Sequence, residues 1–281
     1  MIRTPRLIAT DLDGTLVRRD RTVGPRTAKV LAQLGVPVVL VTGRPIRWLA
    51  EVYEQLAIQP LAICANGAAI YDPAADAIVH SEPLTPDRLR EACERLRAAV
   101  PDVVFAVERD GGRAMRYEER FPVGLWERDH RAVQPMPFAE MVSQPAAKLL
   151  VRAGADWTRI PGQTMTGAQA ADEFTTLVRA CLAGIAEATH SSSSGLAEVS
   201  APGVTKASGL AWVAESLGVE ARDVLAFGDM PNDLPMFAWA GFAVAMANGH
   251  PAARAAADAV TPATNDEDGV AAYLEGLLNG D

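Results

Sequence analysis

Short apolar runs that stop abruptly at polar turn residues recur near both ends of the chain. The first run, residues 6–10, stops at Asp11, and the second, residues 36–41, stops at Thr42. Runs of this length are typical of strands buried on both faces of a parallel sheet. Two further runs of the same kind cover residues 61–65 and 224–227. Polar residues after such strands are expected at one rim of the sheet, where open α/β sheets bind their ligands.

Segments with apolar residues at helical spacing lie between these runs. In the segment 22–35, Val30, Leu31 and Leu34 form one apolar stripe, and Gly35 follows as a stop signal. Comparable segments cover residues 45–56, 204–217, 234–239, 251–257 and 268–278, with one more strand at 242–246. The alternation of strand and helix predicts parallel βαβ units. The two ends of the chain are therefore predicted to form one doubly wound, Rossmann-like α/β sheet.

The middle of the chain carries a different pattern. Its predicted elements are hairpins within residues 68–81 and 103–118, a strand at 148–152, and helices at 85–100 and 170–182. Hairpins combined with separate helices indicate an α+β module rather than further βαβ units. We therefore expect a core domain in two parts, residues 1–82 and 200–281, interrupted by an inserted domain at residues 83–199.

Composition and charge exclude several classes of protein. The chain of 281 residues has a net charge of −9 and a pI near 5.0, whereas proteins that bind nucleic acid usually present a basic face. No apolar run approaches the roughly 18 residues of a membrane helix, and the first acidic motif comes too early for a signal peptide. The three cysteines show no CxxC spacing, as expected in a reducing compartment. We expect a cytoplasmic protein with neither nucleic acid nor membrane as its partner.

The candidate chemistry lies where the predicted strands and helices begin or end. Asp11 and Asp13 leave the same side of an extended chain, because strand side chains alternate in direction, so the two can share a cation or a reacting group. The other polar residues at such ends are Thr42, Lys206, Asp229, Asn232 and Asp233. Taken singly, each has an ordinary alternative as a turn, helix-cap or surface residue. Their common position at element ends is what indicates a site.

The combined motifs resemble those of the haloacid dehalogenase superfamily of phosphotransferases. Asp11-Leu12-Asp13-Gly14-Thr15 matches the first motif of that superfamily, Thr42-Gly43-Arg44 the second, Lys206 the third, and residues 228–233 the fourth. The gap between Thr42 and Lys206 is similar in size to the large α/β cap of the Cof-type sugar-phosphatase branch. The resemblance thus implies a phosphatase whose doubly wound core carries an inserted cap domain.

The resemblance also implies how the site works. The enzyme would be a Mg²⁺-dependent hydrolase of small phosphorylated metabolites, sugar phosphates in particular. Asp11 would attack phosphorus to form an aspartyl-phosphate, and Asp13 would protonate the leaving alcohol and later activate water. The implied metal ligands are Asp11, the main-chain carbonyl of Asp13, and Asp229. The transferring oxygens would be held by the amides of Leu12 and Gly43 and the side chains of Thr42, Lys206 and Asn232. Asp233 would orient Lys206 or a metal-bound water.

Several alternatives remain open. A phosphomutase of the same superfamily would use the same core residues and return the phosphoryl group to its substrate. A non-catalytic sensor of phosphorylated metabolites is disfavoured, because it needs neither Asp11 nor Asp13. A nucleotide-binding Rossmann protein is also disfavoured, because no GxGxxG sequence follows the first strand. Asn66 and Gly67 are interpreted as a structural turn at the end of the third strand. The sequence identifies neither the substrate nor the oligomeric state.

Overall fold

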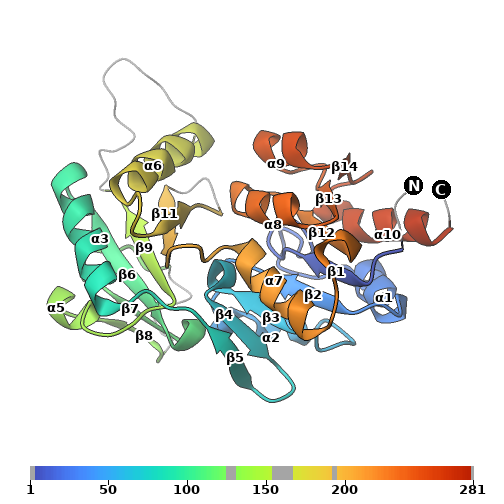
Figure 1. Cartoon of the computed structure of the whole chain (residues 1–281), viewed down its shortest axis with the longest axis horizontal. Helices are drawn as coiled ribbons and strands as arrows, with labels where there is room; N and C mark the ends of the chain where they lie inside the picture. The colour runs from blue at the N-terminus through green and yellow to red at the C-terminus, as the bar shows by residue number, and fades with distance from the viewer. Residues whose placement is uncertain (1–3, 125–130, 154–166, 192–194, 280–281) are drawn as a thin grey trace. The chain divides into compact units, whose positions relative to one another are not determined.

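The computed structural model describes residues 4–124, 131–153, 167–191 and 195–279 (Figure 1). The chain divides into two compact units. The core unit comprises residues 1–44, 48–80 and 205–281, and the inserted unit comprises residues 45–47 and 81–204. The domain boundaries expected from the sequence, at residues 82/83 and 199/200, remain a prediction.

The core unit is built on an eight-stranded sheet with the strand order β14-β13-β12-β1-β2-β3-β4-β5. Its strands are β1 (Leu7–Thr10), β2 (Val38–Val41), β3 (Ala62–Cys64), β4 (Ala69–Asp72), β5 (Ala77–Ser81), β12 (Val224–Gly228), β13 (Phe242–Ala245) and β14 (Ala259–Val260). All pairings from β14 to β3 are parallel, and β4 runs antiparallel to β3. The described sheet is therefore a parallel α/β sheet extended at one edge.

Helices cover both faces of this sheet. They are α1 (Pro25–Gln33), α2 (Ala50–Tyr53), α7 (Lys206–Ser216), α8 (Leu234–Trp239), α9 (Pro251–Ala256) and α10 (Gly269–Asn279). Leu7 and Ala9 of β1 share one core cluster with Leu210 of α7 and Phe237 of α8. On the other face, Phe227 of β12 meets Tyr273 of α10 edge to ring, with centroids 5.6 Å apart. Each buried Leu or Phe side chain contributes roughly 1.5–3 kcal/mol. The doubly wound α/β core predicted from the sequence is confirmed.

The register of the central strands aligns the residues that follow them. Thr10, the last residue of β1, pairs with Leu40 of β2 and with Phe227 of β12. The three parallel strands therefore end at nearly the same level. Asp11, Thr42 and Asp229 each follow within two residues of these positions, so the sheet delivers all three to one rim.

The inserted unit contains a six-stranded sheet with the order β10-β11-β9-β6-β7-β8. Its strands are β6 (Val104–Arg109), β7 (Ala114–Tyr117), β8 (Val133–Pro135), β9 (Lys148–Arg152), β10 (Glu187–Thr189) and β11 (Leu196–Ser200), and its described helices are α3 (Pro86–Ala99), α5 (Phe138–Met141) and α6 (Gly167–Cys181). The pairings are antiparallel except that of β7 with β8. The inserted α+β architecture is as predicted.

One face of the inserted sheet carries buried charge as well as apolar side chains. Glu108 of β6 pairs with Arg47, and Lys148 of β9 pairs with Glu198 of β11 at 2.7 Å. Glu198 also accepts a hydrogen bond from Ser191 at 2.5 Å. All four charged side chains of the two ion pairs are at most 7% exposed. Buried ions of this kind must be paired, because an isolated buried charge is strongly destabilising.

Some sequence predictions of secondary structure were wrong in detail. The helix expected at residues 45–56 is broken into a short 3₁₀ turn, Ile46–Trp48, and the four-residue helix α2. The irregular region around Pro135 and Pro137 contains β8 and α5, which the pattern did not predict. Strands β10, β11 and β14 were also missed. Among the described residues, no helix is long and apolar enough to span a membrane.

Candidate active site

Lys206 occupies the centre of the polar rim at the strand ends of the core unit. Its ammonium donates to Asp11 at 2.5 Å and to Asp233 at 2.6 Å. The Lys206 and Asp233 side chains are fully buried, and that of Asp11 is 7% exposed. A lysine buried in this way is stable only because two carboxylates share its charge. These three residues therefore form one charged cluster.

The start of α7 fixes the position of Lys206. The Thr205 side chain accepts from the Ser208 amide and the Ser208 hydroxyl accepts from the Thr205 amide, a capping box that begins the helix at Lys206. Gly67 packs against this helix end, since a Cβ atom there would lie 2.1 Å from the Thr205 carbonyl oxygen. Gly209 allows the same close approach one turn later, where a Cβ would lie 3.1 Å from the Cα of Gly67. The two glycines bring the helix end against the sheet.

Asp229 joins the same cluster from the end of β12. Its carboxylate accepts a hydrogen bond from Thr15 at 3.1 Å. Gly14, with φ of 82°, allows the turn after Asp13 to pass close to this carboxylate, because a Cβ at Gly14 would lie 2.3 Å from Asp229 Oδ2. The glycine after the paired aspartates is thus required both by the turn and by the approach of Asp229.

The electrostatics of the cluster reflect an excess of negative charge. Burial raises the pKa of Asp11 to about 7; Lys206 opposes the rise, and Asp233 and Asp13 add to it. Burial, Asp11 and Asp233 likewise hold the pKa of Asp229 well above its usual range. Burial would lower the pKa of Lys206, but Asp11 and Asp233 outweigh it and raise the pKa. The lysine is therefore charged, and the carboxylates around it are under-neutralised.

The donor set around Asp11 and Asp229 fits a hard divalent cation. Carboxylate oxygens of Asp11, Asp229 and Asp233 lie within 4.8 Å of one another. Asp233 already accepts from Lys206 and from the amides of Asp229 and Met230, so its oxygens are used in holding the loop together. Asp11 and Asp229 supply the oxygen ligands that Mg²⁺ prefers, and a cation between them would offset their repulsion.

Asp13 lies apart from the lysine cluster and pairs with Arg44. The guanidinium of Arg44 donates from Nε to Asp13 Oδ2 at 2.7 Å and from Nη2 to Asp13 Oδ1 at 2.5 Å. The Arg44 side chain is 7% exposed, whereas that of Asp13 is 56% exposed. A bidentate pair with one buried partner fixes the plane of the carboxylate while leaving it open to solvent.

Thr42 and Asn232 complete the set of predicted site residues. Asn232 contacts Asn66, a residue that the sequence pattern indicates only as part of a structural turn. The Thr42 hydroxyl accepts from the Arg44 amide at 3.0 Å, which leaves its own hydrogen to be donated. The Asn232 amide group donates to Asn66 at 3.1 Å. Asn66 is 3% exposed and lies at the end of β3. Leu12 is also fully buried at the rim, and Gly43 lies between Thr42 and Arg44.

The sequence prediction missed three residues that the structure brings to the rim, namely Thr15, Arg44 and Asn66. Thr15 and Arg44 lie inside the motifs already quoted, but the sequence contains no signal for the partner of either side chain. Asn66 follows an apolar strand, as Asp11 and Thr42 do, and that position was a usable signal. The structure therefore extends the candidate site beyond the predicted residues.

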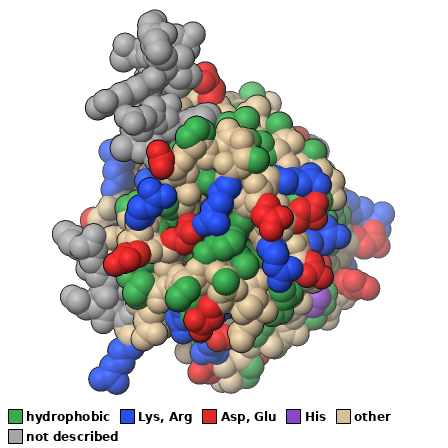
Figure 2. Space-filling model, turned by 90° about the vertical axis from the view of Figure 1, so that its left-hand side faces the viewer, with side chains coloured by type: hydrophobic (Ala, Val, Ile, Leu, Met, Phe, Trp, Pro, Cys, Tyr) green, Lys and Arg blue, Asp and Glu red, His purple; other side chains and the backbone are tan. Residues whose placement is uncertain are grey.

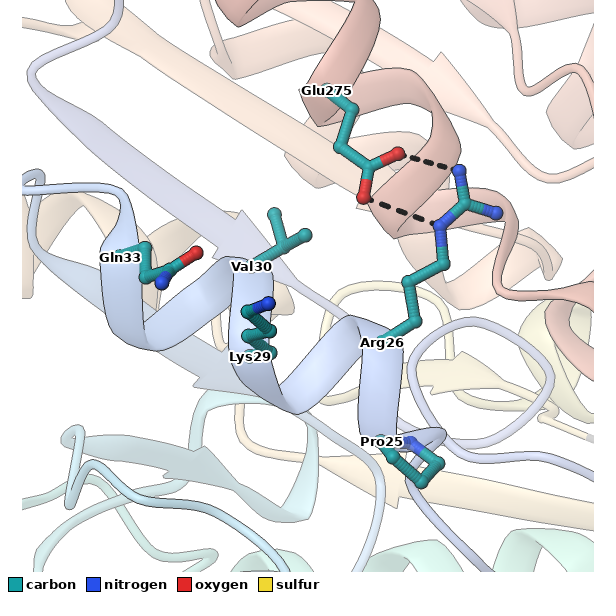
Figure 3. A pocket seen from close by; sticks show the side chains of 6 residues that line it. All are labelled: Pro25, Arg26, Lys29, Val30, Gln33 and Glu275. Atoms are coloured by element: carbon teal, nitrogen blue, oxygen red, sulfur yellow. Dashed lines mark hydrogen bonds and ion pairs between the residues drawn. The ribbon is translucent and has the colours of Figure 1, made fainter.

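A groove elsewhere on the described part of the core unit lacks a buried charged cluster like that around Lys206. Figure 3 shows a groove between α1 and α10 lined by Pro25, Arg26, Lys29, Val30, Gln33 and Glu275. Its principal interaction is the exposed ion pair of Arg26 with Glu275 at 2.5 Å. Such a pair is worth little in water. On the face drawn in Figure 2, the described basic and acidic side chains are interspersed rather than gathered by sign.

The fold and the site define a class of protein. A family profile described as haloacid dehalogenase-like hydrolase matches residues 8–274. The chain therefore belongs to the haloacid dehalogenase-like hydrolase family.

Relatives along the whole chain narrow this class. The chain is 28% identical over 294 residues to the 5-amino-6-(5-phospho-D-ribitylamino)uracil phosphatase YitU of Bacillus subtilis, covering 96% of this chain and 97% of that protein. It is 28% identical over 280 residues to the pyridoxal phosphate phosphatase YbhA of Escherichia coli, covering 96% and 98%. The solved structure of the HAD subclass IIB sugar phosphatase BT4131 has the same fold, with a TM-score of 0.75 at 20% identity, covering 97% of this chain and 98% of that one. The predicted superfamily and Cof-type branch are confirmed, and the chain is a phosphoric monoester hydrolase.

Proposed function

We propose that the protein hydrolyses small phosphorylated metabolites, sugar phosphates in particular, through an aspartyl-phosphate on Asp11. The observation that carries this proposal is the buried cluster of Asp11, Lys206 and Asp233 with Asp229 beside it. Phosphoryl transfer requires charge neutralisation and positioning above all. A nucleophilic carboxylate beside a buried ammonium and a second carboxylate suits that requirement.

Each residue of the site has a distinct part in the proposed reaction. Asp11 attacks phosphorus and displaces the alcohol, which splits the hydrolysis into two easier steps. Asp13, exposed but oriented by Arg44, protonates the leaving oxygen and then takes a proton from the attacking water. Lys206 attracts the transferring oxygens and lowers the repulsion between the phosphate and the carboxylates. The other groups that hold these oxygens are the Leu12 and Gly43 amides, Thr42 and Asn232.

Mg²⁺ is the metal that we propose for this site. Asp11, the main-chain carbonyl of Asp13 and Asp229 would hold it, and when bound it would supply positive charge that offsets the repulsion of the substrate phosphate by the carboxylates. Asp233 acts instead through Lys206 and the loop that carries Asp229. A cytoplasmic location remains a prediction from the sequence.

The proposed substrate class is tested by a phosphate-release screen. The purified chain with Mg²⁺ is incubated with hexose, pentose and alditol phosphates, pyridoxal phosphate and nucleoside monophosphates. Release of inorganic phosphate from one or more sugar phosphates, faster than from the nucleotides, is expected. Positional isomerisation of a sugar phosphate without release would instead identify a phosphomutase and contradict the proposal.

Chelation is expected to abolish hydrolysis reversibly. Removing the cation leaves the carboxylates of Asp11 and Asp229 facing the dianionic substrate with too little positive charge, because Lys206 is already shared between Asp11 and Asp233. Phosphate release should fall to the background rate after dialysis against EDTA and return when Mg²⁺ is added. Hydrolysis that continues undiminished in chelator would remove Asp229 from the proposed ligands.

Replacing Arg44 with lysine is expected to lower kcat by about tenfold on alkyl phosphates, because lysine cannot hold the Asp13 carboxylate in two hydrogen bonds. The loss should be smaller on p-nitrophenyl phosphate, whose leaving group needs little protonation. Steady-state rates on glycerol phosphate and on the aryl ester measure the difference.

Arg26 on α1 offers a matched control for Arg44, because it lies outside the proposed site. Arg26 also makes a two-bond contact, from Nε at 3.2 Å and Nη2 at 2.5 Å to Glu275, in the groove of Figure 3. Arg26→Lys should leave both rates unchanged. Equal losses on the two substrates in Arg44→Lys would show that Arg44 does not act through leaving-group protonation.

A further inference from the structure

The turn that follows β3 has an unusual backbone. Ala65, Asn66 and Gly67 are three successive residues with positive φ, at 51°, 58° and 109°. Only glycine adopts this region freely, asparagine tolerates it, and alanine does so at an energetic cost. Strain of this kind persists only where the surrounding structure holds it, and it is concentrated at functional sites. The strained backbone therefore indicates that this turn does more than reverse the direction of the chain.

The main chain of this turn holds the loop that follows β2. The Ala65 amide donates to the Arg44 carbonyl at 3.1 Å, and the Asn66 amide donates to the Thr42 carbonyl at 3.0 Å. Those two hydrogen bonds fix both ends of the segment that carries the Thr42 hydroxyl and the Gly43 amide. An ordinary turn at this point, with its amides directed elsewhere, would leave that segment without these two bonds.

The end of the turn contacts the helix that carries Lys206. Gly67 lies so close to the Thr205 carbonyl that a Cβ would approach it to 2.1 Å. Its positive φ and missing side chain are both needed for this approach. The same three-residue turn is thus in contact with the Thr42 loop on one side and with the start of α7 on the other.

The Asn66 side chain reaches the loop after β12. Its Oδ1 accepts from Nδ2 of Asn232 at 3.1 Å, and both residues are at most 5% exposed. The amide nitrogen of Asn232 carries two hydrogens, of which one is used here and the other can be donated to an anion. The Oδ1 of Asn232 is buried and has no hydrogen-bond partner among the described residues. Among the described residues, the Asn232 side-chain amide is therefore oriented by its hydrogen bond to Asn66.

We propose that Asn66 is a positioning residue for the phosphoryl group, and that it acts by orienting the Asn232 amide while its backbone aligns Thr42. This inference rests on the proposed function. The turn of residues 65–67 then contacts the three segments that carry Thr42, Lys206 and Asn232, and so holds these phosphate-binding residues in fixed positions relative to one another. The sequence pattern indicates only a structural turn at these residues.

The test separates the side chain of Asn66 from its backbone. Asn66→Gly removes the acceptor for Asn232 but retains the backbone amide and the freedom to adopt positive φ. We expect kcat/KM for phosphate-ester hydrolysis to fall by about tenfold or more, as when a residue that orients a catalytic group is lost. The inhibition constant of inorganic phosphate should rise by a similar factor, while the melting temperature falls by only a few degrees, the cost of one unpaired buried amide.

A control variant removes a comparable interaction elsewhere in the core unit. Asp76, in the turn between β4 and β5, also has positive φ, at 47°, and its carboxylate accepts from the Tyr71 hydroxyl at 2.9 Å. Asp76→Gly therefore loses its side-chain contact with Tyr71 at a left-handed residue, as Asn66→Gly loses its contact with Asn232. Its kcat/KM and its inhibition by phosphate should equal those of the parent.

A double-mutant cycle distinguishes positioning from general structural support. If Asn66 acts through Asn232, the double variant Asn66→Gly/Asn232→Ala should be no less active than Asn232→Ala alone. Losses that multiply in the double variant would overturn the proposal, as would Asn66→Gly activity within about twofold of the parent. Failure of the proposed function would look different, because the parent itself would then release no phosphate from any monoester.

Discussion

Replacing Asp11 with asparagine is expected to abolish turnover, with a loss of at least about 10³-fold in kcat, because the amide keeps the shape of the side chain but is not a nucleophile. The same change removes one of the two carboxylates that we propose as metal ligands. Phosphate release under saturating substrate and Mg²⁺ measures the effect.

The fold of Asp11→Asn should survive. An asparagine oxygen can still accept from Lys206, and the substitution removes a negative charge from a cluster that has too many, so the melting temperature should be unchanged or higher. Asp20→Asn is a suitable control, since Asp20 is exposed and its bonds to Thr22 can be retained by asparagine. Turnover of Asp11→Asn within about tenfold of the parent would contradict the covalent mechanism.

Replacing Lys206 with methionine is expected to be the most damaging change to stability and to remove activity as well. Methionine fills a similar volume, but the buried carboxylates of Asp11 and Asp233 lose the cation that both of them contact. Removing one partner from a buried ion cluster costs about 3–5 kcal/mol. Urea denaturation of the metal-free protein should show a transition at markedly lower denaturant concentration.

A second substitution separates stability from catalysis. In Lys206→Met/Asp233→Asn the uncompensated charge is reduced, so part of the lost stability should return. Activity should not return, since the ammonium proposed to attract the phosphoryl oxygens is still missing. Recovery of hydrolysis in the double variant would show that Lys206 serves only to neutralise Asp233.

The parts of the site that the sequence predicts are those determined locally. Asp11, Thr42 and Asp229 each follow an apolar strand, and the end of a buried strand is readable from a few consecutive residues. The pairing of Asp11 with Lys206 spans 195 residues and that of Asn66 with Asn232 spans 166, and no local pattern encodes such distances. For Lys206 the resemblance to a family supplied what spacing could not, whereas Asn66 had only its local turn preference.

The errors in the predicted fold have similar causes. Strands β10 and β14 contain three and two residues, too few for an alternating pattern to be recognised. Strand β8 ends at Pro135, which reads as a strand breaker but is tolerated at the edge of a sheet. The helix predicted from the apolar spacing at 45–56 is interrupted at Leu49, where tertiary packing overrides local preference.

The position of β1 in the sheet has a consequence for how the molecule is made. Strand β1 is completed within the first residues of the chain, yet one of its two neighbours, β12, begins only at Val224. During synthesis, one edge of β1 therefore stays unpaired at least until residues 224–228 have left the ribosome. That edge is short and wholly apolar apart from Thr10, the type of edge that pairs with foreign strands if it stays exposed. Asp11, which follows β1, can pair with Lys206 only after residue 206 has been made, so a product that stops before Lys206 lacks the charged cluster.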